Sequence, residues 1–158
     1  MIAEQITNIK TFMSHLLIKD SFDGFDVTDV SITTYNTFTI DGHVHKSFYS
    51  PDEYETITEK EISSWKTLKP FCYQIIKGHN TPLKFKIVFK MPEDITESIA
   101  EASQMPLSDI EGLYLNVVYE NGNLTCITGT SLNIFDMSKD TEKAFDRYVS
   151  SFVSTLSC

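Results

Sequence analysis

The first third of the chain changes from helical to strand-like spacing of its apolar residues. Apolar side chains recur every three or four positions from Ile6 to Leu17, which predicts an amphipathic helix over residues 5–19. Residues 1–5 form a short candidate strand before it. After the break at SFDGFD, residues 25–49 are rich in Val, Ile, Phe and Thr, a composition typical of strands.

A turn signal, Asp41-Gly42, lies inside the segment TFTIDGHVHKSFY. A two-residue loop would pair Ile40 with His43, whereas a three-residue loop would pair Ile40 with Val44. We favour the second register because a buried face fixes register, and this one gathers the apolar side chains Phe38, Ile40, Val44 and Phe48. The sequence therefore predicts a hairpin that turns at Gly42.

An acidic connector, residues 50–61, follows this predicted hairpin. It contains two capping-box sequences, Ser50-x-x-Glu53 and Thr58-x-x-Glu61, which are typical of helix N-termini. The second is favoured as a helix start because a periodic apolar run comes directly after it.

That run predicts a helix over residues 62–77, which Gly78 ends and Pro70 kinks or divides. Strict alternation then predicts a strand from Leu83 to Met91. Its inward positions are Leu83, Phe85, Ile87, Phe89 and Met91.

The last third predicts a helix, a hairpin and a helix. A short helix is expected over residues 93–104, with Ile95, Ile99 and Ala102 on its apolar side. Asn121-Gly122 is the strongest turn signal of the chain and predicts a type I′ hairpin. The segment TGTS, residues 128–131, is expected to end one strand and begin another. Ser138 should cap a C-terminal helix over residues 139–156.

Two segments of the chain resemble each other at a constant offset. Ile40, Gly42 and Phe48 match Ile127, Gly129 and Phe135, because 127 − 40 = 87 and the other pairs share this difference. One interpretation is a duplication into two β-α-β-β-β units, each followed by an extra helix; accidental matching of short segments is the other. The predicted fold class is α+β, an antiparallel sheet with helices packed on one face.

The domain prediction is one domain over residues 1–158, because this length suits one hydrophobic core. Its candidate halves are 1–50 and 83–137. An acidic linker and helix, residues 51–78, would connect them, and the helix 139–156 would follow.

Two resemblances extend these inferences. The segment 91–137, above all LYLNVVYENGNLTCITGT, resembles the helix-and-hairpin sequence of bacterial DNA sliding clamps, which implies a clamp-like fold for a single domain. SITTYNTFTIDG, TPLKFKIVF and YENGNLTCITGTSL resemble an uncharacterised bacterial family of unknown function, over most of the chain. Neither resemblance implies an activity, since fold alone does not fix function.

Charge and cysteine content restrict the classes of function. Thirteen Lys and Arg against twenty-two Asp and Glu give a net charge of −9, which argues against general binding of nucleic acid or anionic membranes. The N-terminus does not read as a signal peptide, and no apolar run approaches the length of a membrane helix. The cysteines Cys72, Cys126 and Cys158 are widely spaced, which favours free thiols in a reducing cytoplasm.

Lysines are concentrated in the middle of the chain. Six lysines and no acidic residue occur from Lys66 to Lys90. Lys84, Lys86 and Lys90 share the outward side of the predicted strand. Two interpretations remain: the lysines keep an exposed sheet surface from aggregating, or they bind an acidic partner or a second copy of the protein.

His43 and His45 are the candidate chemical groups of the sequence. Residues i and i+2 of a strand point the same way, so both imidazoles could reach one metal ion, with Asp41 as a third ligand. His15 and His79 each stand alone. The other interpretation is a surface hairpin that carries histidines.

The leading functional hypothesis is a non-enzymatic intracellular adaptor that acts through protein–protein contacts or self-association and needs no cofactor. Lys84, Lys86 and Lys90 are its candidate binding residues. The alternatives are a small metal-dependent hydrolase that uses Asp41, His43 and His45, and a clamp-like accessory protein for nucleic acid. The acidic helix 93–104 argues against the last, because its carboxylates would repel phosphate.

Overall fold

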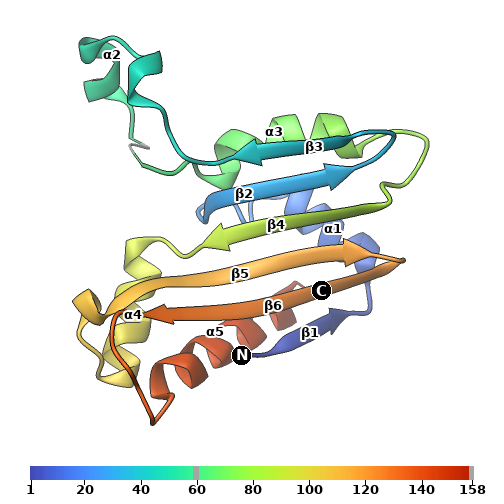
Figure 1. The fold of residues 1–158 in the computed structure, drawn as a ribbon. Helices are drawn as coiled ribbons and strands as arrows, with labels where there is room; N and C mark the ends of the chain where they lie inside the picture. The colour runs from blue at the N-terminus through green and yellow to red at the C-terminus, as the bar shows by residue number, and fades with distance from the viewer. Residues whose placement is uncertain (59–60, 157–158) are drawn as a thin grey trace.

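A single six-stranded antiparallel sheet organises the chain in a computed structural model that describes residues 1–58 and 61–156 (Figure 1). The strands lie in the order β1-β6-β5-β4-β2-β3. Their bounds are β1 Ala3–Ile6, β2 Asp26–Thr33, β3 Thr37–Asp41, β4 Lys84–Lys90, β5 Ile110–Glu120 and β6 Asn123–Leu132. The strands β1 and β3 therefore form the two edges.

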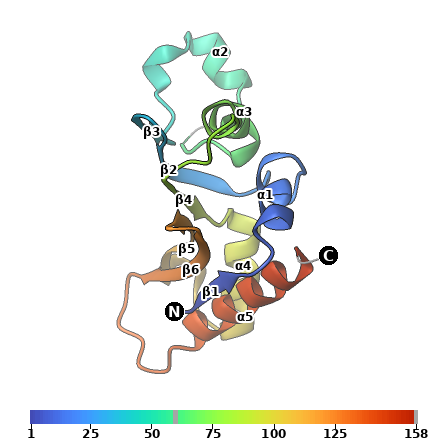
Figure 2. The same cartoon turned by 90° about the vertical axis from the view of Figure 1, so that its right-hand side faces the viewer.

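Four helices cover one face of the sheet and leave the other face open (Figure 2). They are α1 Ile9–Leu17, α3 Trp65–Ile76, α4 Glu93–Ser103 and α5 Asp140–Thr155. The short helix α2, Pro51–Thr56, stands away from this layer, as does the 3₁₀ turn η1, Lys46–Phe48; a second turn, η2, covers Leu107–Asp109. The predicted α+β class, with helices on one face of an antiparallel sheet, is confirmed.

Aromatic rings fill the core between the helices and the sheet. Phe22 contacts Phe12, Phe25, Phe89 and Phe152, with ring centroids 5.2–5.8 Å apart. Trp65 at the start of α3 is fully buried, and its Nε1–H donates to the Leu16 carbonyl over 2.7 Å. This bond satisfies a carbonyl in the last turn of α1 and joins the two helices.

The internal duplication is not confirmed. The element order β-α-β-β does occur twice, as β1-α1-β2-β3 and β4-α4-β5-β6. The sheet positions differ, however, because β4 pairs with β5 and β2, whereas β1 pairs with β6 alone. The expected third strand of each unit is also missing from the described residues. In the first unit η1 occupies its place, and in the second unit β6 runs unbroken to Leu132 through the position where a new strand was expected.

The predicted turn at Asp41-Gly42 is wrong. The hairpin of β2 and β3 turns earlier, at Thr34–Asn36, and pairs Ile40 with Val30. Gly42 continues in extended conformation beyond β3, where its N–H donates to the Thr28 carbonyl and its carbonyl accepts from Ser63 N–H. The glycine serves a close approach of two backbones rather than a turn, because a Cβ on Gly42 would lie 1.7 Å from the Val27 carbonyl oxygen.

Several smaller corrections follow from tertiary packing. The first helix begins at Ile9, after a genuine strand, and the helix predicted from residue 62 begins at Trp65. No cap forms at Thr58 among the described residues, and part of that capping box, residues 59–60, lies outside them. The predicted inward positions Leu83 and Ala102 are exposed. Gly129 lies within β6 opposite Tyr114 and not at a turn.

Other local predictions are confirmed. Asn121 and Gly122 have φ angles of 54° and 76°, as a type I′ turn requires, and β5 and β6 pair on either side of them. Ser50 and Glu53 form the predicted capping box at the start of α2. Cys72 and Cys126 are buried free thiols, while Cys158 lies outside the described residues.

Candidate functional site

The open face of the sheet is the broadest surface that no helix covers (Figures 1 and 2). Its middle row is formed by Lys84, Lys86, Val88 and Lys90 of β4. The side chains on both sides are mainly polar, with Asp29, Ser31 and Thr33 on β2 and Tyr114, Asn116, Val118 and Glu120 on β5. None of these positions is buried, which is the pattern of an antiparallel sheet with one solvated side.

The three candidate lysines project from this face as the alternation predicted. Lys84 and Lys86 are exposed, Lys90 is half-buried, and none of them forms an ion pair with another described residue. Acidic neighbours nevertheless flank two of them, because Lys84 is paired laterally with Glu120 and Lys90 with Asp26. These lateral pairs depend on strand order and are not visible in the sequence.

Lys86 differs from its two neighbours on β4. Its lateral partners are Ser31 and Val118, which carry no charge. It also lines a hollow of about 360 Å³ on the open face, together with Asp29, Ser31, Thr39 and Asp41. Lys86 is thus the lysine of this row without an acidic lateral partner, although Asp29 and Asp41 line the same hollow.

The run of six lysines in the sequence does not become one uniform positive surface. Lys69 is mostly buried and donates to Asp23 Oδ1 over 2.6 Å and to the Lys19 carbonyl over 3.0 Å. It therefore belongs to the fold, where it ties α3 to the segment after α1.

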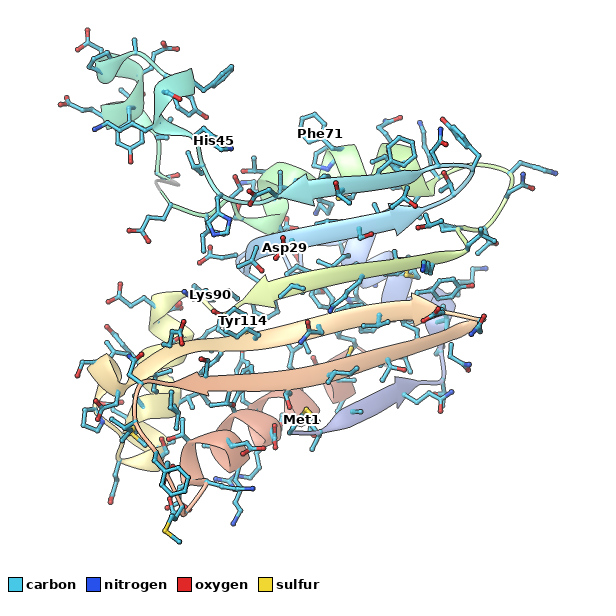
Figure 3. The ribbon with its side chains drawn as sticks, viewed as in Figure 1. Met1, Asp29, His45, Phe71, Lys90 and Tyr114 are labelled. Atoms are coloured by element: carbon cyan, nitrogen blue, oxygen red, sulfur yellow. The ribbon has the colours of Figure 1, made fainter. Side chains whose placement is uncertain are left out.

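The histidine segment lies at the end of β3, on the way to α2 (Figure 3). Asp41 Oδ1 accepts from the backbone N–H of His43 over 3.0 Å and contacts its Nδ1 over 2.5 Å. The backbone hydrogen bond, followed by the side-chain one, holds the pKa of the Asp41 carboxyl below its ordinary value. His45 is exposed and precedes η1.

The structure thus brings two of the three candidate metal ligands together. Within residues 1–58 and 61–156, no group of three or more His, Cys, Asp or Glu side chains is arranged to hold a metal ion. A cavity of about 570 Å³ does gather carboxylates, from Asp26, Glu61, Glu93 and Glu111, around Lys90. These carboxylates also fall short of such an arrangement.

An arm extends from the end of β3 (Figure 1). The sequence predicted its first part, up to Tyr49, as the end of a hairpin and the remainder as an acidic linker. Its base is a short ladder, in which His43 bridges to Ile62 and Val44 N–H donates to the Glu61 carbonyl over 2.8 Å. Beyond the base, residues 45–58 include η1 and α2, neither of which contains a buried residue. Phe48 is 82% exposed. In the sequence, the aromatic cluster SFYSPDEY within an acidic stretch was the signal that could have indicated this arm.

The fold and surface together define an α+β protein with one open sheet face, an exposed arm and no helix, within the described residues, long and apolar enough to cross a bilayer. The chain belongs to a family of unknown function, DUF5721, whose family model matches residues 15–157. Neither the curated proteins nor the solved structures contain a match, so the resemblance to sliding clamps gains no support.

Proposed function

We propose that this protein is a non-enzymatic binding protein and that the open face of its sheet receives an acidic segment of a partner protein. The observation that carries this proposal is the row of Lys84, Lys86 and Lys90 on a face that no helix covers. Lysines that form no ion pair with residues 1–58 and 61–156 are available to pair across an interface, where charge complementarity raises the association rate and the specificity.

The mixed character of this face fits a peptide or protein better than a nucleic acid. Asp26, Asp29 and Glu120 stand beside the lysines and would repel a continuous phosphate backbone. A protein segment with both acidic and polar groups can instead match lysines, hydroxyls and carboxylates in register. The buried thiols Cys72 and Cys126 support the further proposal that the protein works in the reducing cytoplasm.

The test is a charge reversal at Lys86 with a matched control. Lys86→Glu changes the net charge from −9 to −11 without placing a carboxylate beside an acidic lateral partner. Lys143→Glu makes the same change on an exposed position of α5, in the helical layer. Tagged wild type and both variants are used to capture partners from the native host at low and high salt.

We expect a protein that wild type and Lys143→Glu recover and that Lys86→Glu recovers at least tenfold less, with the difference greatest at low salt. Three identical sets of captured proteins would refute the open-face proposal. The hydrolase alternative is not proposed, because Asp41 is engaged by His43 and lacks a third ligand among the described side chains.

A further inference from the structure

The strand β3 presents an unprotected edge. Gly42 N–H donates to the Thr28 carbonyl, and backbone groups alternate along an antiparallel pair. Phe38 and Ile40 therefore direct their backbone groups toward β2, whereas Thr37, Thr39 and Asp41 direct theirs toward the free edge. The sequence TFTID has neither the proline nor the lysine with which natural edge strands commonly block pairing.

Exposed apolar side chains gather around this edge. The described residues leave ten large apolar side chains exposed. Three of them, Tyr35, Phe48 and Phe71, lie in the turn before β3, in η1 after it and on α3, and a fourth, Leu83, lies beside the β2–β3 turn. Phe71 lies beside the β3 edge on the outer side of α3 (Figure 3). Phe38 and Ile40 are only half-buried. Such a concentration of apolar surface marks a site of association.

The arm has an exposed aromatic cluster and no core of its own. Phe48 packs edge-on against Tyr49 at 5.2 Å, and Lys46 Nζ lies 5.2 Å from the centroid of Tyr54. Asp52, Glu53 and Glu55 make the arm acidic. A cluster of this kind is stabilised when a surface outside the chain covers it.

A hollow of about 520 Å³ at the other end of β3 complements the aromatic and acidic groups of the arm. Tyr35, Ile75 and Leu83 form its apolar wall, and Lys77 and His79 also line it. It lies beside the β2–β3 turn, whereas the arm leaves the opposite end of β3. The arm and the hollow of one chain are therefore separated by the length of the strand.

We propose that two copies of this protein pair through their β3 edges about a twofold axis, and that the arm of each copy covers the hollow of the other. In an antiparallel pair of β3 strands, the end that leads into one arm meets the end beside the other copy's hollow. A twofold axis at Thr39 pairs Thr37 with Asp41, so no like charges oppose each other. Phe38 then faces Ile40 of the other copy.

Charge and surface chemistry support the arm of a second copy, rather than an unrelated protein, as the occupant of the hollow. The acidic arm meets Lys77, and Phe48 meets an apolar wall, so a single docking step covers both exposed groups. The open face remains uncovered in the dimer, and the proposal is therefore independent of the partner-binding function proposed for Lys86.

The test is the mass of the intact protein in solution, measured by light scattering and sedimentation. The protein concentration is varied from about 1 to 100 µM, which spans the dissociation constants of weak to moderate dimers. We expect a dimer of the 18.0 kDa chain. Thr39→Pro removes an N–H that faces the free edge and should raise the dissociation constant at least tenfold. Phe48→Ser should do the same, while its matched control Phe135→Ser, at an 87% exposed position in another loop, should not.

A second measurement keeps the test decisive if Thr39→Pro fails to fold. Thr39→Cys should form a disulfide between copies on mild oxidation, because the axis brings the two positions to the spacing of a hydrogen-bonded pair. Lys77→Glu should weaken the dimer, and adding Asp52→Lys with Glu55→Lys should restore part of the affinity. A monomeric wild type across the range would overturn the proposal, as would a dimer that Phe48→Ser leaves unchanged and Thr39→Cys does not cross-link.

Discussion

The backbone of Gly42 lies against the carbonyl of Val27, so closely that a Cβ on Gly42 would sit 1.7 Å from the Val27 oxygen and 2.7 Å from its carbon. This contact coincides with the irregularity in β2 between Val27 and Asp29. It positions the base of the arm against the end of the sheet. The contact therefore links the fold to the segment that carries the exposed aromatic cluster.

We expect Gly42→Ala to destabilise the protein by about 2 kcal/mol or more, because one of two backbones must move to admit the methyl group. Gly24→Ala is the matched control, since a Cβ on Gly24 would have no atom within 4 Å. The measurement is the midpoint of urea unfolding at one protein concentration. Equal midpoints for the two variants would show that the Val27 contact is readily relieved.

The bond between Trp65 and Leu16 yields a second prediction. Trp65→Phe retains an aromatic ring in the core but leaves the Leu16 carbonyl without its donor, at an expected cost of about 1–3 kcal/mol. Unfolding must be followed by far-ultraviolet circular dichroism, because Trp65 is the only tryptophan of the chain. Phe135→Leu, a similar change at an exposed position, should stay within about 0.5 kcal/mol. A loss no greater than this for Trp65→Phe would argue that water replaces the indole donor.

The two Asp/Asn-Gly sequences of this chain show where sequence reasoning succeeds and where it fails. Asn121-Gly122 forms the predicted turn, because the signal and the structure are both local. Asp41-Gly42 carries a similar signal, yet its glycine is required by a contact with Val27, fifteen positions earlier in the chain (42 − 27). Local sequence cannot distinguish a glycine that turns from a glycine that admits a neighbouring backbone.

The candidate site residues likewise divide into features that local sequence predicts and features that depend on the tertiary fold. Alternation along β4 was sufficient to place Lys84, Lys86 and Lys90 on one face. The acidic neighbours of Lys84 and Lys90 follow from β5 and β2 flanking β4, which is a property of topology. The arm was predicted partly as the end of a hairpin, with Phe48 on its buried face, and partly as a linker, because local spacing does not show whether an apolar side chain is covered by the sheet.

The capping box of α2 predicts a pH dependence confined to the arm. The Ser50 backbone N–H donates to Glu53 Oε1, and this bond, followed by a smaller effect of the Ser50 side chain, lowers the pKa of Glu53. Because the folded-state pKa of Glu53 is lowered, the capping box contributes stability that is present above the unfolded-state pKa. This stability is lost as the pH falls through the folded-state pKa. We expect Ser50→Ala to raise the pKa of Glu53, measured by NMR titration of its side-chain carbons.

The same substitution should leave the sheet intact, since neither α2 nor η1 contributes a buried residue to the core. Amide exchange should therefore accelerate in residues 51–56 and stay unchanged in β4 and β5. Faster amide exchange throughout the sheet would contradict the view that the arm folds separately from the sheet and the helices packed on it.

The buried thiols give the last prediction. Burial raises the pKa of Cys72 to about 12, and burial with a smaller effect of Glu4 raises that of Cys126 to about 12. Both thiols are therefore protonated at pH 8, and only the thiolate reacts with alkylating reagents. We expect peptides that contain Cys72 or Cys126 to remain unlabelled by iodoacetamide in the native protein and to become labelled in urea. The labelled fraction should follow the unfolding curve from circular dichroism, because each thiol becomes reactive when the core opens. Labelling of Cys72 well below the urea midpoint would instead show that α3 separates from the sheet before the rest of the core.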